Sequence, residues 1–178
     1  TMPGPVFTTG DDVSLHPIED DDHEFVQYGR NHPEVRVSLL SPAIQTTDDV
    51  AESLDDSEYR FLICRAGDDA DPDPVGVVAF AWVPESRRVG FLMYWVAPEH
   101  QGNGYVTEAA ELFLDYAFRE RGFHKVNAHV TASNAASAAV LEKLGFEREG
   151  TRRRQNFVDG AWEDEHLYGL LADEWLDG

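Results

Sequence analysis

Residues 98–107, PEHQGNGYVT, stand where a strand-like pattern gives way to a helical one. A helix N-terminus presents unpaired backbone N–H groups and a partial positive charge, and glycines let an anion approach those groups closely. Gly102 and Gly104 remove side-chain bulk, and Thr107 offers a hydroxyl in the first turn. The segment therefore predicts a site where main-chain donors hold a diphosphate. The alternative is a plain strand end followed by a helix entry, because a short glycine pattern is a weak signal.

Hydrophobic spacing predicts the elements on either side of this turn. Strands are expected at 13–19, 59–66, 74–84, 87–98, 124–132, 147–158 and 161–171. Helices are expected at 20–30, 47–55, 104–121 and 133–146, the last ending at Gly145. Residues 1–12, rich in Pro, Gly, Thr and Asp, predict a flexible leader, so that 13–178 form a single domain.

The order of these elements predicts the fold class. Segments 74–84 and 87–98 form a plausible hairpin around Glu85–Ser86. An antiparallel meander comes first and a β-α-β-α-β-β series follows. This order indicates an α+β fold, a mixed sheet wrapped by helices, with a parallel step across the helix at 104–121.

The charge balance limits the partners. The chain has 34 Asp and Glu against 14 Lys and Arg, a formal net charge of −20, and its only lysines are Lys125 and Lys143. Such a surface repels phosphate backbones, so no nucleic-acid partner is expected. The acidity could attract a cationic substrate or adapt the protein to high salt. Acid spread over every segment, with lysine nearly absent, favours the halophilic explanation.

Cysteine usage and hydropathy indicate a cytoplasmic protein. No stretch approaches the roughly 20 apolar residues that cross a bilayer, and the first residues lack a signal pattern, so no membrane partner is expected. Cys64 is the single cysteine and cannot form an internal disulfide, which fits a reducing compartment. It lies in the apolar run FLIC and predicts a buried structural thiol.

Three segments together resemble one known family. The turn from Gln101 to Val106, with YWVAP before it, resembles the acetyl-CoA-binding signature Q/R-x-x-G-x-G/A of the GNAT superfamily of N-acetyltransferases. NAASAAVLEKLGF (134–146) looks like the second half of that signature. The tail from Gly150 resembles the Rim-like branch, which acetylates ribosomal-protein N-termini. The resemblance covers residues 13–176 and implies a GNAT-like, mostly antiparallel sheet of about seven strands, with about four helices and one parallel splayed pair.

The resemblance implies transfer of an acetyl group from acetyl-CoA to a primary amine by direct attack. The acceptor is expected to be a protein or peptide N-terminus, such as that of a ribosomal protein. A small amine as acceptor and a non-catalytic CoA-binding domain stay open as alternatives. No metal is expected, because the histidines show no metal-ligand spacing. An edge strand near the C-terminus could pair two copies as a homodimer.

The resemblance also implies which residues hold acetyl-CoA. Main-chain groups near Trp95 and Val96 would pair with the pantetheine, and the Val96 N–H would polarise the thioester carbonyl, unless it makes an ordinary ladder bond. The full expected set is Trp95, Val96, Gln101, Gly102, Asn103, Gly104, Tyr105, Val106, Thr107, Asn134 and Ser137. Val106 replaces the usual Gly or Ala, which is tolerated if this position already has helical dihedrals. Asn134 could instead be a plain N-cap.

Catalytic roles are the least determined. Ser137, one turn after Asn134, would return a proton to the departing sulfur, or it is simply a small residue where a helix packs closely. The usual strand glutamate is absent, because the segment reads GFLMYWV. Glu163, Asp164 and His166 are substitute bases, although each could be a solvated strand residue, and a water chain could suffice. The cluster Arg152–Arg154 predicts charge balance for nearby acids or a contact with the CoA 3′-phosphate.

Overall fold

The computed structural model describes residues 3–55, 58–66, 72–84 and 86–178. In these ranges eight strands form one hydrogen-bonded sheet in the order β1-β2-β3-β4-β5-β6-β8-β7. The strands are β1 (Thr8–Thr9), β2 (Val13–His16), β3 (Arg60–Arg65), β4 (Asp73–Trp82), β5 (Val89–Val96), β6 (Lys125–Thr131), β7 (Glu147–Val158) and β8 (Ala161–Leu171). The expected strands are all present, and β1 is additional. Glu85, in the expected hairpin turn, lies outside the described residues.

The helices also match the expected positions, with three additions, α2, η2 and α6. They are η1 (Asp20–Asp22), α1 (His23–Asn31), α2 (Pro33–Ser38), α3 (Thr47–Asp55), η2 (Pro98–His100), α4 (Tyr105–Asp115), the π-helical turn η3 (Tyr116–Glu120), α5 (Ala135–Lys143) and α6 (Ala172–Leu176). Short α2 was not predicted, because six residues give no helical repeat. Its start is set by Pro33 at the first position and by the His32 ring, which accepts a hydrogen bond from the Glu34 N–H.

The sheet has one parallel step, and this confirms the α+β class. Strand β5 pairs with β6 in parallel. The pairs β1–β2, β2–β3, β3–β4, β6–β8 and β7–β8 are antiparallel. Parallel neighbours need a long crossover, and here α4 and η3 supply it.

The chain divides into two compact units, and the expected single domain stays a prediction. The first unit comprises Thr1–Ala79 and Tyr94–Phe113, and the second comprises Phe80–Met93 and Leu114–Gly178. Strands β4 and β5 and helix α4 each contribute residues to both units.

In the first unit, aromatic packing holds α1 and the first residues of the chain. The Phe7 ring stacks on Phe61 with centroids 4.7 Å apart. Strand β1, which lies within the segment predicted to be a flexible leader, pairs with β2. The Trp95 indole lies 5.5 Å from the Phe25 ring. A Cβ on Gly29 would stand 2.1 Å from the Trp95 ring, so α1 approaches β5 through a position without a side chain.

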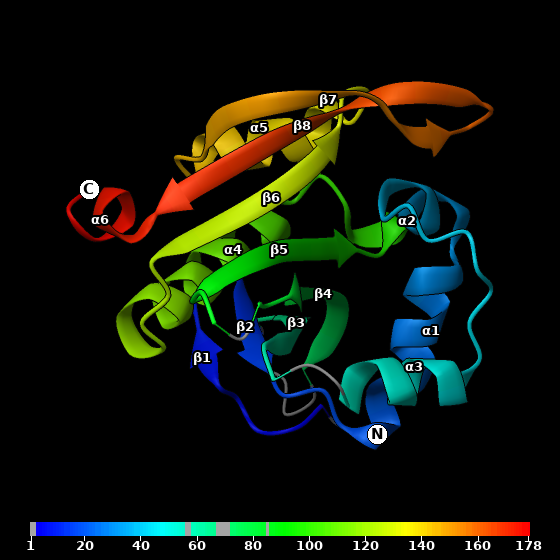
Figure 1. The fold of residues 1–178 in the computed structure, drawn as a ribbon. Coiled ribbons are helices and arrows are strands. Elements are labelled where there is room, and N and C mark those ends of the chain that lie inside the picture. The colour runs from blue at the N-terminus through cyan, green and yellow to red at the C-terminus, as the bar shows by residue number, and fades with distance from the viewer. Residues whose placement is uncertain (1–2, 56–57, 67–71, 85) are drawn as a thin grey trace. The chain divides into compact units, whose positions relative to one another are not determined.

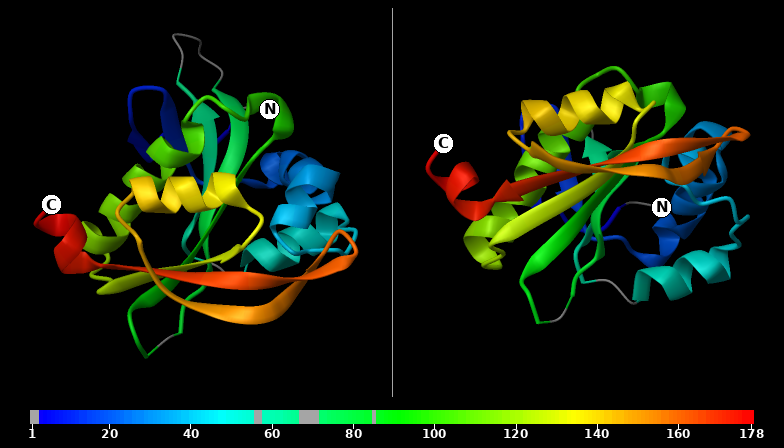
Figure 2. Two further views of the ribbon diagram at one scale, coloured as in Figure 1. Left: turned by 90° about the horizontal axis from the view of Figure 1, so that it is seen from above. Right: turned by 45° about the horizontal axis from the view of Figure 1, so that its top comes forward.

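In the second unit, strands β6, β8 and β7 carry a helix on one face. Figures 1 and 2 show α5 lying along one side of β6, β8 and β7. Val126, Ala128 and Val130 alternate along β6 as its buried positions. Because residues alternate along β6, side chains at 127, 129 and 131 project from the face away from α5.

Helix α6 is fastened to the same unit, since the Trp175 indole donates a hydrogen bond of 2.8 Å to Asp115.

Cys64 gives a pH-dependent test of this core. Its side chain is fully buried on β3, and burial, with smaller contributions from Asp22 and Asp73, raises the pKa of the thiol from 9.0 to about 12. We expect the folded protein to react slowly with a thiol reagent at pH 8 and quickly after unfolding, because only the thiolate is nucleophilic. Rapid labelling of the folded protein would contradict this.

The same shift has a defined sign for stability. Because the folded pKa lies above the unfolded one, the stability contributed by the neutral thiol is complete below pH 9 and is lost as the pH rises from about 9 toward 12. Denaturant midpoints measured across that interval should fall less steeply in Cys64→Ala than in the wild type.

Candidate active site

The glycine turn between η2 and α4 leaves an open approach to the helix start. Gly102 and Gly104 have φ values of +80° and +78°, in the left-handed region that favours glycine. A Cβ added at either position would meet nothing within 4 Å. The first N–H groups of α4 have no partner within the helix. The turn therefore exposes main-chain donors beside an unfilled space.

Two side chains of the turn fasten its backbone. The Gln101 amide donates a hydrogen bond of 3.2 Å to the carbonyl of Val96, at the end of β5. Asn103 donates to the carbonyls of His100, at 2.9 Å, and Gln101, at 3.3 Å. Both side chains were expected to hold the cofactor, and the structure engages both within the turn itself.

The residues after the glycines begin α4 as expected. Tyr105, Val106 and Thr107 are its first three residues, and all are half-buried. Val106 is not among the residues of positive φ, so its β-branched side chain causes no strain at this position. In the same helix, the Glu108 carboxylate accepts hydrogen bonds from the N–H groups of Asp12 and Val13, at 2.9 Å and 3.3 Å.

This chemistry fits a diphosphate held by the main chain. The segment from Val96 to Thr107 contains no lysine or arginine, so an anion there would rely on backbone N–H groups and on side chains such as the Thr107 hydroxyl. A helix N-terminus with a glycine approach is a recurrent phosphate site for this reason.

The parallel pair beside the turn opens along its length. Pairing between β5 and β6 runs from Val89–Lys125 to Phe91–Asn127 and ends there. Strand β5 continues to Val96 and β6 to Thr131. The expected splay of the parallel pair is thereby confirmed.

Trp95 lies on the part of β5 beyond its pairing with β6, with its side chain directed into the first unit. The residue is 3% exposed, and among the described residues its indole Nε1 is a buried side-chain nitrogen with no hydrogen-bond partner. Such a donor costs about 1–3 kcal/mol when it stays unsatisfied. The expected role of Trp95 and Val96 concerns their main chain, and it stays a prediction.

In the second unit, Asn134 is the N-cap of α5. Its side-chain oxygen accepts a hydrogen bond of 3.1 Å from the Ser137 N–H. The capping alternative is therefore realised, and it fixes Ser137 in the first turn of α5, where the residue is half-buried. The two residues were expected to act together, and the cap brings them together.

The two carboxylates expected to be bases both bind main-chain groups. Glu163 accepts a hydrogen bond of 3.3 Å from the Ser133 N–H, in the turn after β6. Asp164 accepts one of 2.8 Å from the Arg154 N–H, and Arg154 has a φ of +48°. Asp164 thus stabilises an irregular point of β7. His166 is half-buried on β8.

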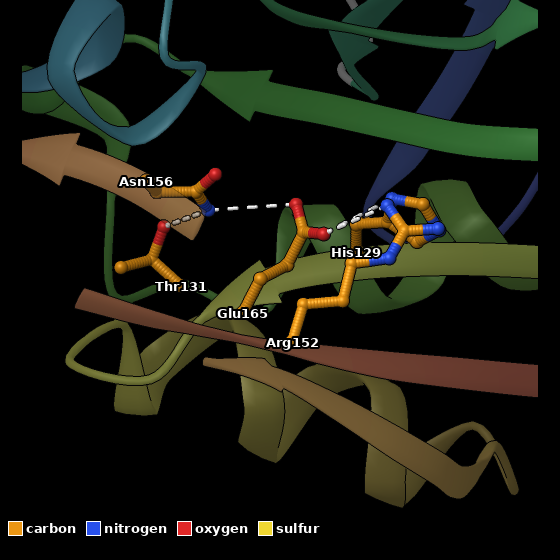
Figure 3. A network of polar contacts seen from close by, with 5 residues as sticks. All are labelled: His129, Thr131, Arg152, Asn156 and Glu165. Carbon is orange, nitrogen blue, oxygen red and sulfur yellow. Dashed lines mark hydrogen bonds and ion pairs between the residues drawn. The ribbon is translucent and has the colours of Figure 1, made fainter. Parts of the chain in front are cut away.

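Glu165, between Asp164 and His166, was not predicted to be a site residue. Glu165 is 6% exposed, and its carboxylate lies 3.3 Å from Arg152 and 3.8 Å from His129. Figure 3 shows these side chains with Asn156, whose amide lies 3.4 Å from Glu165 and 3.1 Å from the Thr131 hydroxyl. Strand alternation along 163–167 was the available signal, but it does not say which face is covered.

Comparison with known proteins identifies the family. Residues 12–147 match the model described as an acetyltransferase (GNAT) domain. The chain belongs to the GNAT acetyltransferase family. It is accordingly an acetyl-CoA-dependent N-acetyltransferase. A probable N-acetyltransferase of Bacillus subtilis, YjcK, is 38% identical over 117 residues. The match spans 65% of this chain and 63% of the length of YjcK.

Two further GNAT relatives differ in their acceptors. The spermidine N(1)-acetyltransferase of Vibrio cholerae is 25% identical over 93% of this chain and 96% of its own length. The [ribosomal protein uS5]-alanine N-acetyltransferase of Escherichia coli is 32% identical over 61% of this chain and 58% of its own.

A solved structure agrees with the fold. The spermidine N-acetyltransferase from Vibrio cholerae, in complex with CoA and spermine, superposes with a TM-score of 0.85, covering 94% of this chain and 99% of that one at 24% identity. Among the described residues, no helix is long and apolar enough to cross a membrane. Within the same ranges, no three His, Cys, Asp or Glu side chains gather as metal ligands.

Asp164 gives a test that separates a structural role from a chemical one. Asp164→Ala should lower the free energy of unfolding by about 1 kcal/mol, since the Arg154 N–H loses its acceptor. Asp164→Asn keeps an oxygen acceptor and should retain most of that stability in denaturant titrations. An acid limb of the pH–rate profile that moved in Asp164→Asn or in Glu163→Gln would instead identify that carboxylate as the base.

Proposed function

We propose that this protein transfers the acetyl group of acetyl-CoA to the primary amine of a small cationic molecule or of a protein N-terminus. The observation that carries the reaction is the open glycine turn at the start of α4, next to a strand whose parallel pairing has ended. The first offers donors for a diphosphate, and the second offers backbone groups for an extended amide chain.

In this proposal the main chain from Gly102 to Thr107 holds the diphosphate, while Gln101 and Asn103 keep the turn in shape. Acetyl-CoA, when bound, supplies the activated acetyl group. The edge of β5 near Trp95 and Val96 pairs with the pantetheine, and the Val96 N–H polarises the carbonyl. In the same proposal the Ser137 hydroxyl, in the first turn of α5, returns a proton to the sulfur.

Two acceptor classes are favoured by different observations. A polyamine is favoured by the spermidine acetyltransferase of Vibrio cholerae, which matches over nearly the whole of both chains. A protein N-terminus, as in the Rim-like branch, is favoured by the higher identity to the uS5-alanine acetyltransferase and by the sequence of the tail. Both acceptors present a primary amine that must be neutral to attack.

We also propose that the protein works in a salt-rich cytoplasm, on the basis of its net charge of −20 and its two lysines. A homodimer would use β7, which lies at the edge of the sheet. In the β7–β8 hairpin, Phe157 and Trp162 are exposed and pack together with ring centroids 5.3 Å apart.

Gly104→Ala tests whether the glycine turn before α4 holds the diphosphate of acetyl-CoA. The left-handed conformation of an alanine costs roughly 1–2 kcal/mol, and the new methyl enters the open space. We expect the Kd for acetyl-CoA, measured by calorimetry, to rise by about tenfold or more.

Gly122→Ala is the matched control, because Gly122 also has positive φ, +66°, and open space around it. It should lose comparable stability and keep its affinity for acetyl-CoA. Equal loss of affinity in both variants would remove the support for a diphosphate at the turn.

The acceptor is tested by release of free CoA in molar KCl, with spermidine and with peptides that begin in alanine. We expect release with at least one of these amines and none with the corresponding Nα-acetylated peptide, which has no primary amine at its end. Thermal stabilisation by acetyl-CoA with no CoA release on any amine would indicate a binding domain instead of an enzyme.

A further inference from the structure

The Glu165 cluster is a set of charged and polar groups that spans three strands of the second unit. Glu165 lies on β8, Arg152 and Asn156 on β7, and His129 and Thr131 on β6. A buried carboxylate is stable only when it is paired and hydrogen-bonded. Arg152 supplies the opposite charge at 3.3 Å, and the Asn156 amide, itself close to Thr131, supplies a donor at 3.4 Å. Arg152 and His129 therefore both face the Oε2 oxygen of Glu165, whereas Asn156 donates to Oε1.

His129 occupies a particular place on β6. The last residue of β6 paired with β5 is Asn127, and His129 follows it on the same face, between the buried residues Ala128 and Val130. Figure 3 shows the Glu165 cluster on the side of the strands away from α5. The imidazole therefore lies where the parallel pair opens, on the face that the helix leaves uncovered.

Two aromatic rings lie in a row with this imidazole. The Phe91 ring, on the last paired residue of β5, contacts His129 edge-on with centroids 5.3 Å apart. Trp82, which is 60% exposed, lies 5.0 Å from Phe91 in turn. Rings of this kind attract amines and ammonium groups through their π-faces. Trp82, Phe91 and His129 thus form a row that ends at the Glu165 carboxylate.

The surroundings of His129 favour a neutral ring. Burial lowers the pKa of His129, Glu165 opposes that shift, and Arg152 adds to it. The charged groups beside the ring are thus Glu165 from β8 and Arg152 from β7, whereas its neighbour on β5 is Phe91. The ring nitrogen nearest Glu165 is Nδ1, and a proton placed on Nδ1 leaves the lone pair of Nε2 available.

We propose that His129 is the general base of the acetyl transfer and that Glu165 is the positioning residue that orients its ring. This inference rests on the proposed function. The amine nitrogen attacks the thioester carbonyl, so that a C–N bond forms while the C–S bond breaks with its electron pair leaving on sulfur. The proton of the amine passes to Nε2 of His129, and the sulfur takes a proton from Ser137 or from water. Water then carries the proton from the imidazolium back to the Ser137 oxygen, or to solvent where water protonated the sulfur, and this restores the free enzyme.

Arg152 limits what Glu165 itself can do. Its guanidinium already balances the carboxylate, so Glu165 is not left to bind the ammonium form of an acceptor. The only group of the Glu165 cluster that is both exposed and able to accept a proton near neutral pH is the imidazole. Its role is therefore the removal of a proton.

The experiment compares His129→Gln with the wild type in CoA release across pH 5.5–9.5, at saturating acceptor, where kcat reports groups of the bound complex. We expect kcat to fall by about 10²–10⁴-fold and the acid limb to disappear. Glu165→Gln should keep that limb but shift it to lower pH, because loss of the carboxylate charge lowers the pKa of His129 further. A structural role alone would lower thermal stability and leave the limb in place.

His124→Gln is the matched control, since His124 is an exposed histidine in the turn just before β6. It should keep the wild-type profile. A folded His129→Gln with the wild-type rate and acid limb would overturn the assignment, as would loss of the limb in His124→Gln. Should His129→Gln fold poorly, His129→Ala with added imidazole replaces it: restored release supports the proposal, and a folded variant without rescue contradicts it.

The outcomes separate the two levels of the proposal. A wild-type protein that binds acetyl-CoA but acetylates no amine contradicts the proposed function. A wild-type protein that is active while His129→Gln is unchanged contradicts only the base assignment.

Discussion

An acidic protein that binds a polyanion needs positive potential from a source other than lysine. In the proposed function the source is the backbone: the start of α4 presents N–H groups, and two glycines of positive φ keep side chains away from them. Gln101 and Asn103 use their amides to fix the turn instead of reaching outward.

The second unit solves a different electrostatic problem. Glu165 is buried, and three strands contribute the groups that satisfy it. The arrangement depends on an irregular β7, whose pairing with β8 shifts between Arg152 and Asn156. That shift includes Arg154 at positive φ, held by Asp164. Asp164, a predicted base, thus binds the backbone at the point where the register shifts and Arg152 comes to lie opposite Glu165.

Elements with a clear period were predictable, and side-chain pairing across strands was not. Strands 147–158 and 161–171 were predicted at their observed limits, because the two-residue turn signal Asp159–Gly160 separates them. Strand β1 was missed, since two residues carry no pattern. Glu165 was missed because an unshifted hairpin would not pair it with Arg152; only the irregularity in β7 does. The glycine turn and the Asn134 cap could be placed from sequence because both depend on local backbone chemistry.

The contact between Gly29 and Trp95 has a consequence for how this protein can vary. The indole occupies the space in which any side chain on residue 29 would lie, and it packs against the face of α1 that includes Gly29 and Phe25. Neither position can be exchanged alone without displacing that helix or opening a void beneath it. Among natural variants of this sequence, the two positions should therefore be replaced as a pair, with a larger residue in the helix accompanied by a smaller one in the strand.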